Sequence, residues 1–368
     1  MIQRLLRGRL LYVSLGLFLI LLYGWEFRHS LAERHHATST AQTDTPIGQR
    51  AHPAQETRPA RARVDLNEWV TSPLDAERFK DALLREPQLG VPLLALTLFA
   101  AGMGIGGIGL TLWACWTGRI RAMWRIASPG VVPWSMGELW RILFVTLALA
   151  SLLPFARSIL LHIRPSWSLD THLWMTVSML CFDIAVTWVI LIFAAGKGRE
   201  VWTALGFSMR KLKQAVRVGF RGYLALFPWI FLLLMGMVEL SQSIGFKPPL
   251  EPIHELIFEE HRSGVLGLTV LLACLVGPVA EELFFRGIVY AMIRRRTNRF
   301  LAMAASGALF SLTHTNWLGF LPIMVFGCLL ADLYERTGSL LSPMAVHILH
   351  NTFLMSLALV VRQLSVSG

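Results

Sequence analysis

Two adjacent carboxylates and an arginine lie inside an apolar stretch of the chain, in the segment Glu281-Glu282-Leu-Phe-Phe-Arg286. Ionisable side chains cost a few kcal/mol each in hydrocarbon, so they persist there when they are paired, solvated or functional. On a helix, Glu282 and Arg286 are four residues apart and share a face, whereas Glu281 points about 100° away. The spacing therefore predicts that Arg286 neutralises Glu282 and leaves Glu281 to act as a general base. The alternative is a buried ion-pair cluster without chemistry.

Two later apolar segments supply histidines, in Phe310-Ser-Leu-Thr-His314 and in His347-Ile-Leu-His350-Asn351. His347 and Asn351 are four residues apart and can aim at one point, which suits hydrogen-bond donation to a developing oxyanion. His350 is the second candidate for that role, with packing as its alternative, and a lone histidine such as His314 also fits a structural role. At 1.5 Å per helical residue, these groups and the two glutamates lie at overlapping depths, so one shared site is expected.

Composition places this site in a membrane. The chain has 368 residues, of which 54% are hydrophobic and 15% charged, whereas a soluble domain has roughly 25% charged residues. The net charge of +11 invites nucleic-acid binding, but the basic residues gather in short loops between apolar segments, where the positive-inside rule places them. We therefore expect a polytopic membrane protein with no nucleic-acid partner. The four cysteines lie in apolar segments without a C-x-x-C pair, which predicts neither a disulfide framework nor a structural zinc site.

A bilayer core is spanned by about 20 apolar residues, and this length predicts an all-α bundle of about nine transmembrane helices. Residues 1–25 form an N-terminal signal anchor, 26–88 an extracytoplasmic polar linker with a short interfacial helix, 89–262 the scaffold helices, and 263–361 the catalytic core. In the first scaffold segment, Gly102 and Gly106 form a GxxxG spacing that permits close helix contact. The eight segments expected after the anchor are 89–116, 139–162, 172–195, 219–241, 264–293, 300–317, 319–334 and 340–361.

The basic loops also predict orientation. Short loops rich in arginine and lysine alternate with short loops that contain few of them. Because the basic loops are expected on the cytoplasmic side, the amino terminus is placed in the cytoplasm. The signal anchor and the polar linker that follows it favour a bacterial inner membrane.

The three polar segments resemble the CAAX-protease and bacteriocin-processing family (CPBP, also called Abi) of intramembrane proteases, which includes the prenyl-protein CAAX endopeptidase. The family pattern is EExxxR, then FxxxH, then HxxxN, and all three occur here in order, each in an apolar segment. The resemblance extends over residues 265–357 and includes the linker from Phe326 to Leu340. It implies a proteolytic hydrolase with a peptide or protein substrate, lipidated or not, reached from the bilayer.

The resemblance also implies roles for individual residues. Glu281 would polarise the water that attacks the peptide carbonyl, and His314 would share the proton transfer. His347 and Asn351 would stabilise the oxyanion. The residues that would shape the site are Glu282, Arg286 and Phe310.

Other chemistries remain as alternatives. Zinc could bind Glu281, His314 and His347 with an open position for water, but no H-E-x-x-H motif is present, so we expect a metal-free glutamate mechanism without a cofactor. Neither G-x-S-x-G nor G-x-G-D occurs, so Asp183 is interpreted as a polar helix contact that could also line the cavity. A non-enzymatic peptide-binding or immunity protein, or a transporter, would use the same polar cluster for recognition.

Overall fold

The computed structural model confirms an all-α fold. Every regular element among the described residues is a helix, and none of them forms a strand. Most of the predicted signal anchor and most of the predicted linker lie outside the described residues. Those described are Tyr12, Leu17, 76–118, 134–163, 170–196, Leu205, 212–245, 252–314 and 318–367.

Within the described part of the chain, six helical segments are long and apolar enough to cross a membrane. They are Pro87–Trp116, which contains α5 (Gly90–Trp116), then α7 (Met136–Ile163), α8 (Thr171–Ala195), α10 (Leu212–Ser243), Ser263–Arg294, and Leu341–Leu364 of α17 (Leu341–Ser367). The predicted polytopic bundle is confirmed, and its count of nine helices is not. Two of the predicted spans, 300–317 and 319–334, are instead the shorter helices α15 (Arg299–Leu312) and α16 (Phe320–Thr337).

Helix α15 has 14 residues, which corresponds to about 21 Å, less than the roughly 30 Å of a hydrocarbon core. It ends because the carbonyl of Phe310 accepts hydrogen bonds from Thr313 Oγ1 at 2.7 Å and from His314 Nδ1 at 3.0 Å. Side chains thereby compete for a carbonyl that the helix would otherwise use. A glycine permits close packing with α16, since a Cβ on Gly307 would lie 2.7 Å from the Met324 carbonyl oxygen. His314 therefore lies just beyond the end of a short helix.

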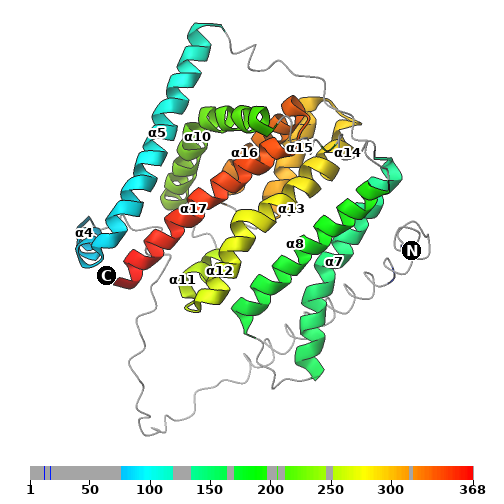
Figure 1. Ribbon diagram of the computed structural model, residues 1–368, viewed down its shortest axis with the longest axis horizontal. Coiled ribbons are helices and arrows are strands. Elements are labelled where there is room, and N and C mark those ends of the chain that lie inside the picture. Colours follow the sequence, from blue (N-terminus) through cyan, green and yellow to red (C-terminus); the bar gives the residue numbers. More distant parts are fainter. Residues whose placement is uncertain are drawn as a thin grey trace.

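The helices that carry the predicted site run through the middle of the bundle (Figure 1). Helix α17 packs beside the Ser263–Arg294 segment, whose outer flank is covered by α8 and then α7. On the other side, α10 packs against both α17 and α5, and α16 packs against α15, α10 and α17. The short helix α4 (Ala76–Arg85) lies where the interfacial helix was predicted and packs near the carboxyl end of α17, where Leu83 contacts a pair formed by Val360 and Leu364.

The central segment Ser263–Arg294 is interrupted by two wider π-helical turns. These are η3 (Leu272–Val276), which follows α12 (Ser263–Leu271), and η4 (Phe285–Tyr290), which precedes α14 (Ala291–Arg294); α13 (Gly277–Phe284) lies between them. The N–H of Gly277 bonds to the carbonyl of Leu272, and Pro278 has no N–H to offer the next carbonyl, that of Ala273. A π-turn therefore precedes Gly277-Pro278, and such turns are often found at functional sites.

Helices α5 and α10 approach each other closely at Gly107. A Cβ on Gly107 would lie 2.1 Å from the Leu224 carbonyl oxygen, and one on Gly106 would lie 3.3 Å from the Leu224 side chain. A Cβ on Gly102 would meet nothing within 4 Å. The GxxxG spacing thus indicated the correct helix, but the contact that requires glycine is one residue further on.

We expect Gly107→Ala to lower the free energy of unfolding by about 1–3 kcal/mol, because the added methyl group overlaps backbone atoms of α10. Gly102→Ala is the matched control on the same helix and should leave stability unchanged or slightly improved. Thermal unfolding of the detergent-solubilised protein measures both. Equal melting temperatures for the two variants would contradict the assigned contact.

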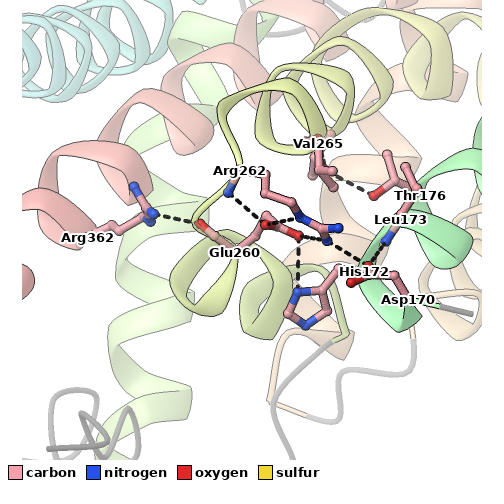
Figure 2. Close-up of polar contacts among 9 residues, drawn as sticks. Asp170, His172, Leu173, Thr176, Glu260, Arg262, Val265 and Arg362 are labelled. Carbon is pink, nitrogen blue, oxygen red and sulfur yellow. Dashed lines mark hydrogen bonds and ion pairs between the residues drawn. The ribbon is translucent and has the colours of Figure 1, made fainter. Parts of the chain in front are cut away.

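A buried carboxylate ties three helices together at one end of the bundle (Figure 2). Glu260, which follows α11 (Pro252–Glu259), is 3% exposed and accepts hydrogen bonds from the backbone N–H and the guanidinium of Arg262. His172 Nδ1 of α8 lies 3.3 Å from the same carboxylate, and Arg362 of α17 donates to the Glu260 carbonyl at 2.6 Å. The starts of α8 and α12 are therefore held against the end of α17.

The hydrogen bonds from Arg262 lower the pKa of Glu260 to about 2, below the roughly 4.3 of an unperturbed glutamate. The linked stability is present above about pH 4.3 and is lost as the pH falls toward 2, because the unfolded chain takes up the proton first. We expect the melting temperature to fall over this range and Glu260→Gln to reduce the slope. Identical slopes for the wild type and the variant would show that Glu260 is not a source of the acid sensitivity.

Candidate active site

Glu282 and Arg286 form a fully buried ion pair on α13 and η4. Arg286 Nη1 donates to Glu282 Oε1 at 2.8 Å, and both side chains have no exposed surface. Arg286 Nη2 also donates to the Gly327 carbonyl of α16 at 3.0 Å, and the guanidinium lies 4.7 Å from the centroid of the Phe310 ring. The arginine therefore joins α13 to the α15–α16 hairpin while it neutralises Glu282, the pairing that the spacing predicted.

His347 of α17 lies between the two glutamates. Its Nδ1 is 2.9 Å from Glu282 Oε1, and its Nε2 is 3.6 Å from Glu281 Oε2. The imidazole is 2% exposed, whereas the Glu281 side chain is 32% exposed. A carboxylate that accepts a hydrogen bond from Nδ1 fixes the tautomer and leaves Nε2 to accept or pass a proton. Glu281 is thus the more accessible of the two carboxylates, and His347 Nε2 can exchange protons with it.

His314 approaches the same group of residues through Phe310. The rings of His314 and Phe310 are 4.8 Å apart, and those of Phe310 and His347 are 5.6 Å apart, so the two imidazoles lie within about 10.4 Å of each other. A carbonyl oxygen can only accept, so Nδ1 of His314 carries the proton that bonds to the Phe310 carbonyl. In the neutral ring the Nε2 lone pair is then free, as a general base requires.

Asn351 is bound to the π-turn that precedes Glu281. Its Nδ2 donates to the Ala273 carbonyl at 2.9 Å, the acceptor for which Pro278 provides no N–H. A carboxamide has two amide hydrogens, so this contact leaves one hydrogen for another acceptor. Asn351 therefore fixes the helix that carries Glu281 and retains one donor for the oxyanion role that its spacing suggested.

His350, the second candidate in the third motif, faces a different set of residues. Its Nδ1 lies 2.8 Å from the hydroxyl of Tyr223 on α10, and its ring stacks on Phe326 at 4.3 Å. Of its two predicted roles, this position fits packing.

Contacts from the scaffold could not be recognised in the motif segments alone. Buried Trp134 donates from Nε1 to the Gly287 carbonyl in η4 at 3.0 Å, and Tyr223 has no exposed surface. Both residues precede the three motifs in the sequence. The signal that could have indicated them is weak: a tryptophan near the start of one apolar segment and a tyrosine inside another. Among the described residues, no group of three or more His, Cys, Asp or Glu side chains has an arrangement suited to a metal ion.

Comparison with known proteins places all seven predicted site residues in one matched segment. Residues 264–353 match the family model described as Rce1-like, type II CAAX prenyl endopeptidase Rce1-like. The family resemblance is confirmed over these residues. A Bacillus subtilis (strain 168) protein, provisionally described as membrane peptidase YdiL, is 32% identical over 92 residues, which are 25% of this chain and 38% of that protein. The match therefore spans well under half the length of that relative, and no solved structure matches significantly.

Proposed function

We propose that this integral membrane protein is an endopeptidase. Its active site lies in the Rce1-like segment and hydrolyses a peptide bond of a substrate. One observation carries the proposal: the two nitrogens of His347 face Glu281 and Glu282, so that a partly exposed carboxylate and a buried, arginine-paired carboxylate share one imidazole. Such an arrangement separates a reactive carboxylate from a structural one, which is how two adjacent acids take different roles. The family and the relative matched above support a peptidase.

In the proposed reaction, Glu281 removes a proton from a water molecule while the water oxygen attacks the peptide carbonyl carbon. His347, as an imidazolium with Nδ1–H bonded to Glu282 and a second proton on Nε2, donates to the resulting oxyanion, and so does the second amide hydrogen of Asn351. When the C–N bond breaks, the proton taken from water passes to the amine, with His314 sharing this transfer. Glu282 and Arg286 hold His347 and the hairpin in place, and Phe310 separates the two imidazoles.

The substrate we propose is a peptide or protein segment, with or without a lipid group, that reaches the site from the bilayer. We further propose a location in a bacterial inner membrane with the amino terminus in the cytoplasm. Within the described chain, the starts of α8 and α12 lie beside the end of α17, and this grouping agrees with the predicted alternation of spans. The proposed mechanism uses no metal cofactor.

The test is cleavage of fluorogenic peptides, with and without a prenylated cysteine, by the full chain in proteoliposomes. His314→Ala should lower kcat/KM by about 10²–10⁴-fold, the usual worth of an acid–base group. His261→Ala, which removes an exposed histidine near the start of α12, is the matched control and should retain wild-type activity.

A strong chelator separates the two chemical alternatives. Unchanged rates after chelation support the metal-free mechanism, whereas inactivation that zinc reverses supports a zinc enzyme. Peptide binding without cleavage, equal in the wild type and His314→Ala, would instead establish a recognition protein.

A further inference from the structure

Asp183 of α8, which lies outside the matched segment, faces Glu281 across Gly277. A Cβ placed on Gly277 would lie 3.6 Å from Asp183 Oδ2 and 3.8 Å from Glu281 Oε1. The two carboxylate oxygens are therefore at most about 7.4 Å apart, the sum of these distances. Glycine at this position places no side chain between them.

The two oxygens of Glu281 are turned toward different groups. Oε1 lies on the side of Gly277 and Asp183, whereas Oε2 lies 3.6 Å from His347 Nε2. Oε2 is buried without a hydrogen-bond partner among the described residues, and Asp183 is half-buried. Two carboxylates withdrawn from water side by side are costly, so the place of Asp183 beside Glu281 calls for an explanation.

Asp183 also belongs to a polar face of α8, and of the three residues on that face it lies furthest along the helix. Positions 172, 176 and 183 share one side of the helix. His172 contacts Glu260 at 3.3 Å (Figure 2). The Thr176 hydroxyl lies 3.1 Å from that of Thr269 on α12. The first two contacts fix α8 against α11 and α12, and the third position brings a carboxylate to the proposed base.

We propose that Asp183 is a positioning residue for Glu281, which it holds through a shared proton or a bridging water so that Oε2 is presented to the attacking water. This inference rests on the proposed function. Glu281 Oε2 takes the proton from water and gives it up to the leaving amine, while the proton or water between Oε1 and Asp183 stays in place. Asp183 therefore has the same protonation state before and after each turnover.

The effect of pH on this pair depends on every charged or titratable group near Glu281. These groups are Asp183 of α8, His347 of α17, His314 after α15, and Glu282 and Arg286 of its own helical segment. Among them, Asp183 is the acid contributed by another helix. Two carboxylates that share a site resist carrying two negative charges, so removing one changes the pH range over which the other is a base.

The experiment compares pH profiles of kcat/KM for the wild type and three variants of the full chain in proteoliposomes. Asp183→Asn should lower kcat by about 10–100-fold through misplacement of the base, with KM within about twofold, and extend activity to lower pH. Asp183→Glu retains a carboxylate and should keep the wild-type acidic limb. Thr176→Val breaks another contact between α8 and the central segment and should leave both kcat and the acidic limb unchanged.

Wild-type kcat and an unmoved acidic limb in Asp183→Asn would overturn the inference, as would an equal displacement of the limb in Thr176→Val. If Asp183→Asn does not fold, a displaced acidic limb in Asp183→Glu overturns it and an unmoved limb supports it. Glu281→Gln separates this inference from the function on which it rests. Wild-type cleavage by Glu281→Gln removes the proposed base itself, whereas an inactive Glu281→Gln beside an unaltered Asp183→Asn removes only the role of Asp183.

Discussion

Replacing Glu281 by glutamine is expected to lower kcat/KM by about 10³-fold or more and to leave the fold intact. Glutamine has nearly the same shape but cannot take a proton from water, and general-base catalysis is worth roughly 10²–10⁴-fold. The Glu281 side chain is 32% exposed, and its contact with His347 Nε2 is 3.6 Å long. After its replacement, His347 Nδ1 keeps its partner Glu282 at 2.9 Å. The measurement is steady-state cleavage of a peptide reporter, together with the melting temperature of each preparation.

Glu259→Gln is the matched control, since it removes an exposed glutamate at the end of α11. It should retain both wild-type activity and wild-type stability. Full activity in Glu281→Gln would assign the base to another residue, with His314 the next candidate because its Nε2 is free in the neutral ring. A large fall in melting temperature would instead indicate that Glu281 is structural.

The part of the site that could be predicted is the part set by helical spacing. Glu282 and Arg286 are four residues apart, and that separation alone brings their side chains together on one helix. The histidines could be placed only by depth, because nothing local specifies that His347 comes between two glutamates 65 residues away. Tertiary packing of α17 against α13 makes that contact.

The fold was predictable where the length of an apolar segment determines the helix. The prediction failed where polar side chains end a helix. A count of apolar residues treats 300–317 as one span, but hydrogen bonds from Thr313 and His314 to the Phe310 carbonyl end α15 at Leu312. Pro278 indicates from sequence only that one backbone N–H is missing from the helix. The hydrogen bond that the Ala273 carbonyl accepts from Asn351 depends on a residue from another helix.

Replacing Arg286 by methionine is expected to lower the free energy of unfolding by about 3–5 kcal/mol, because it leaves a buried carboxylate without its cation. Glu282 has no exposed surface, and after the change its remaining described partner is His347 at 2.9 Å. The Gly327 carbonyl would also lose its hydrogen bond from Arg286. Arg296→Met is the control, since Arg296 is exposed beyond the end of α14, and it should unfold as the wild type does.

A second substitution distinguishes an unpaired charge from lost packing. In the double variant Arg286→Met with Glu282→Gln, the buried negative charge is gone, so much of the stability lost in Arg286→Met should return. Activity should not return with it, because glutamine cannot orient His347 as a carboxylate does. Stability that stays as low in the double variant as in Arg286→Met would mean that Arg286 contributes mainly through its contacts with Gly327 and Phe310. Recovery of stability without recovery of activity would show that this ion pair supports both the bundle and the imidazole that faces Glu281.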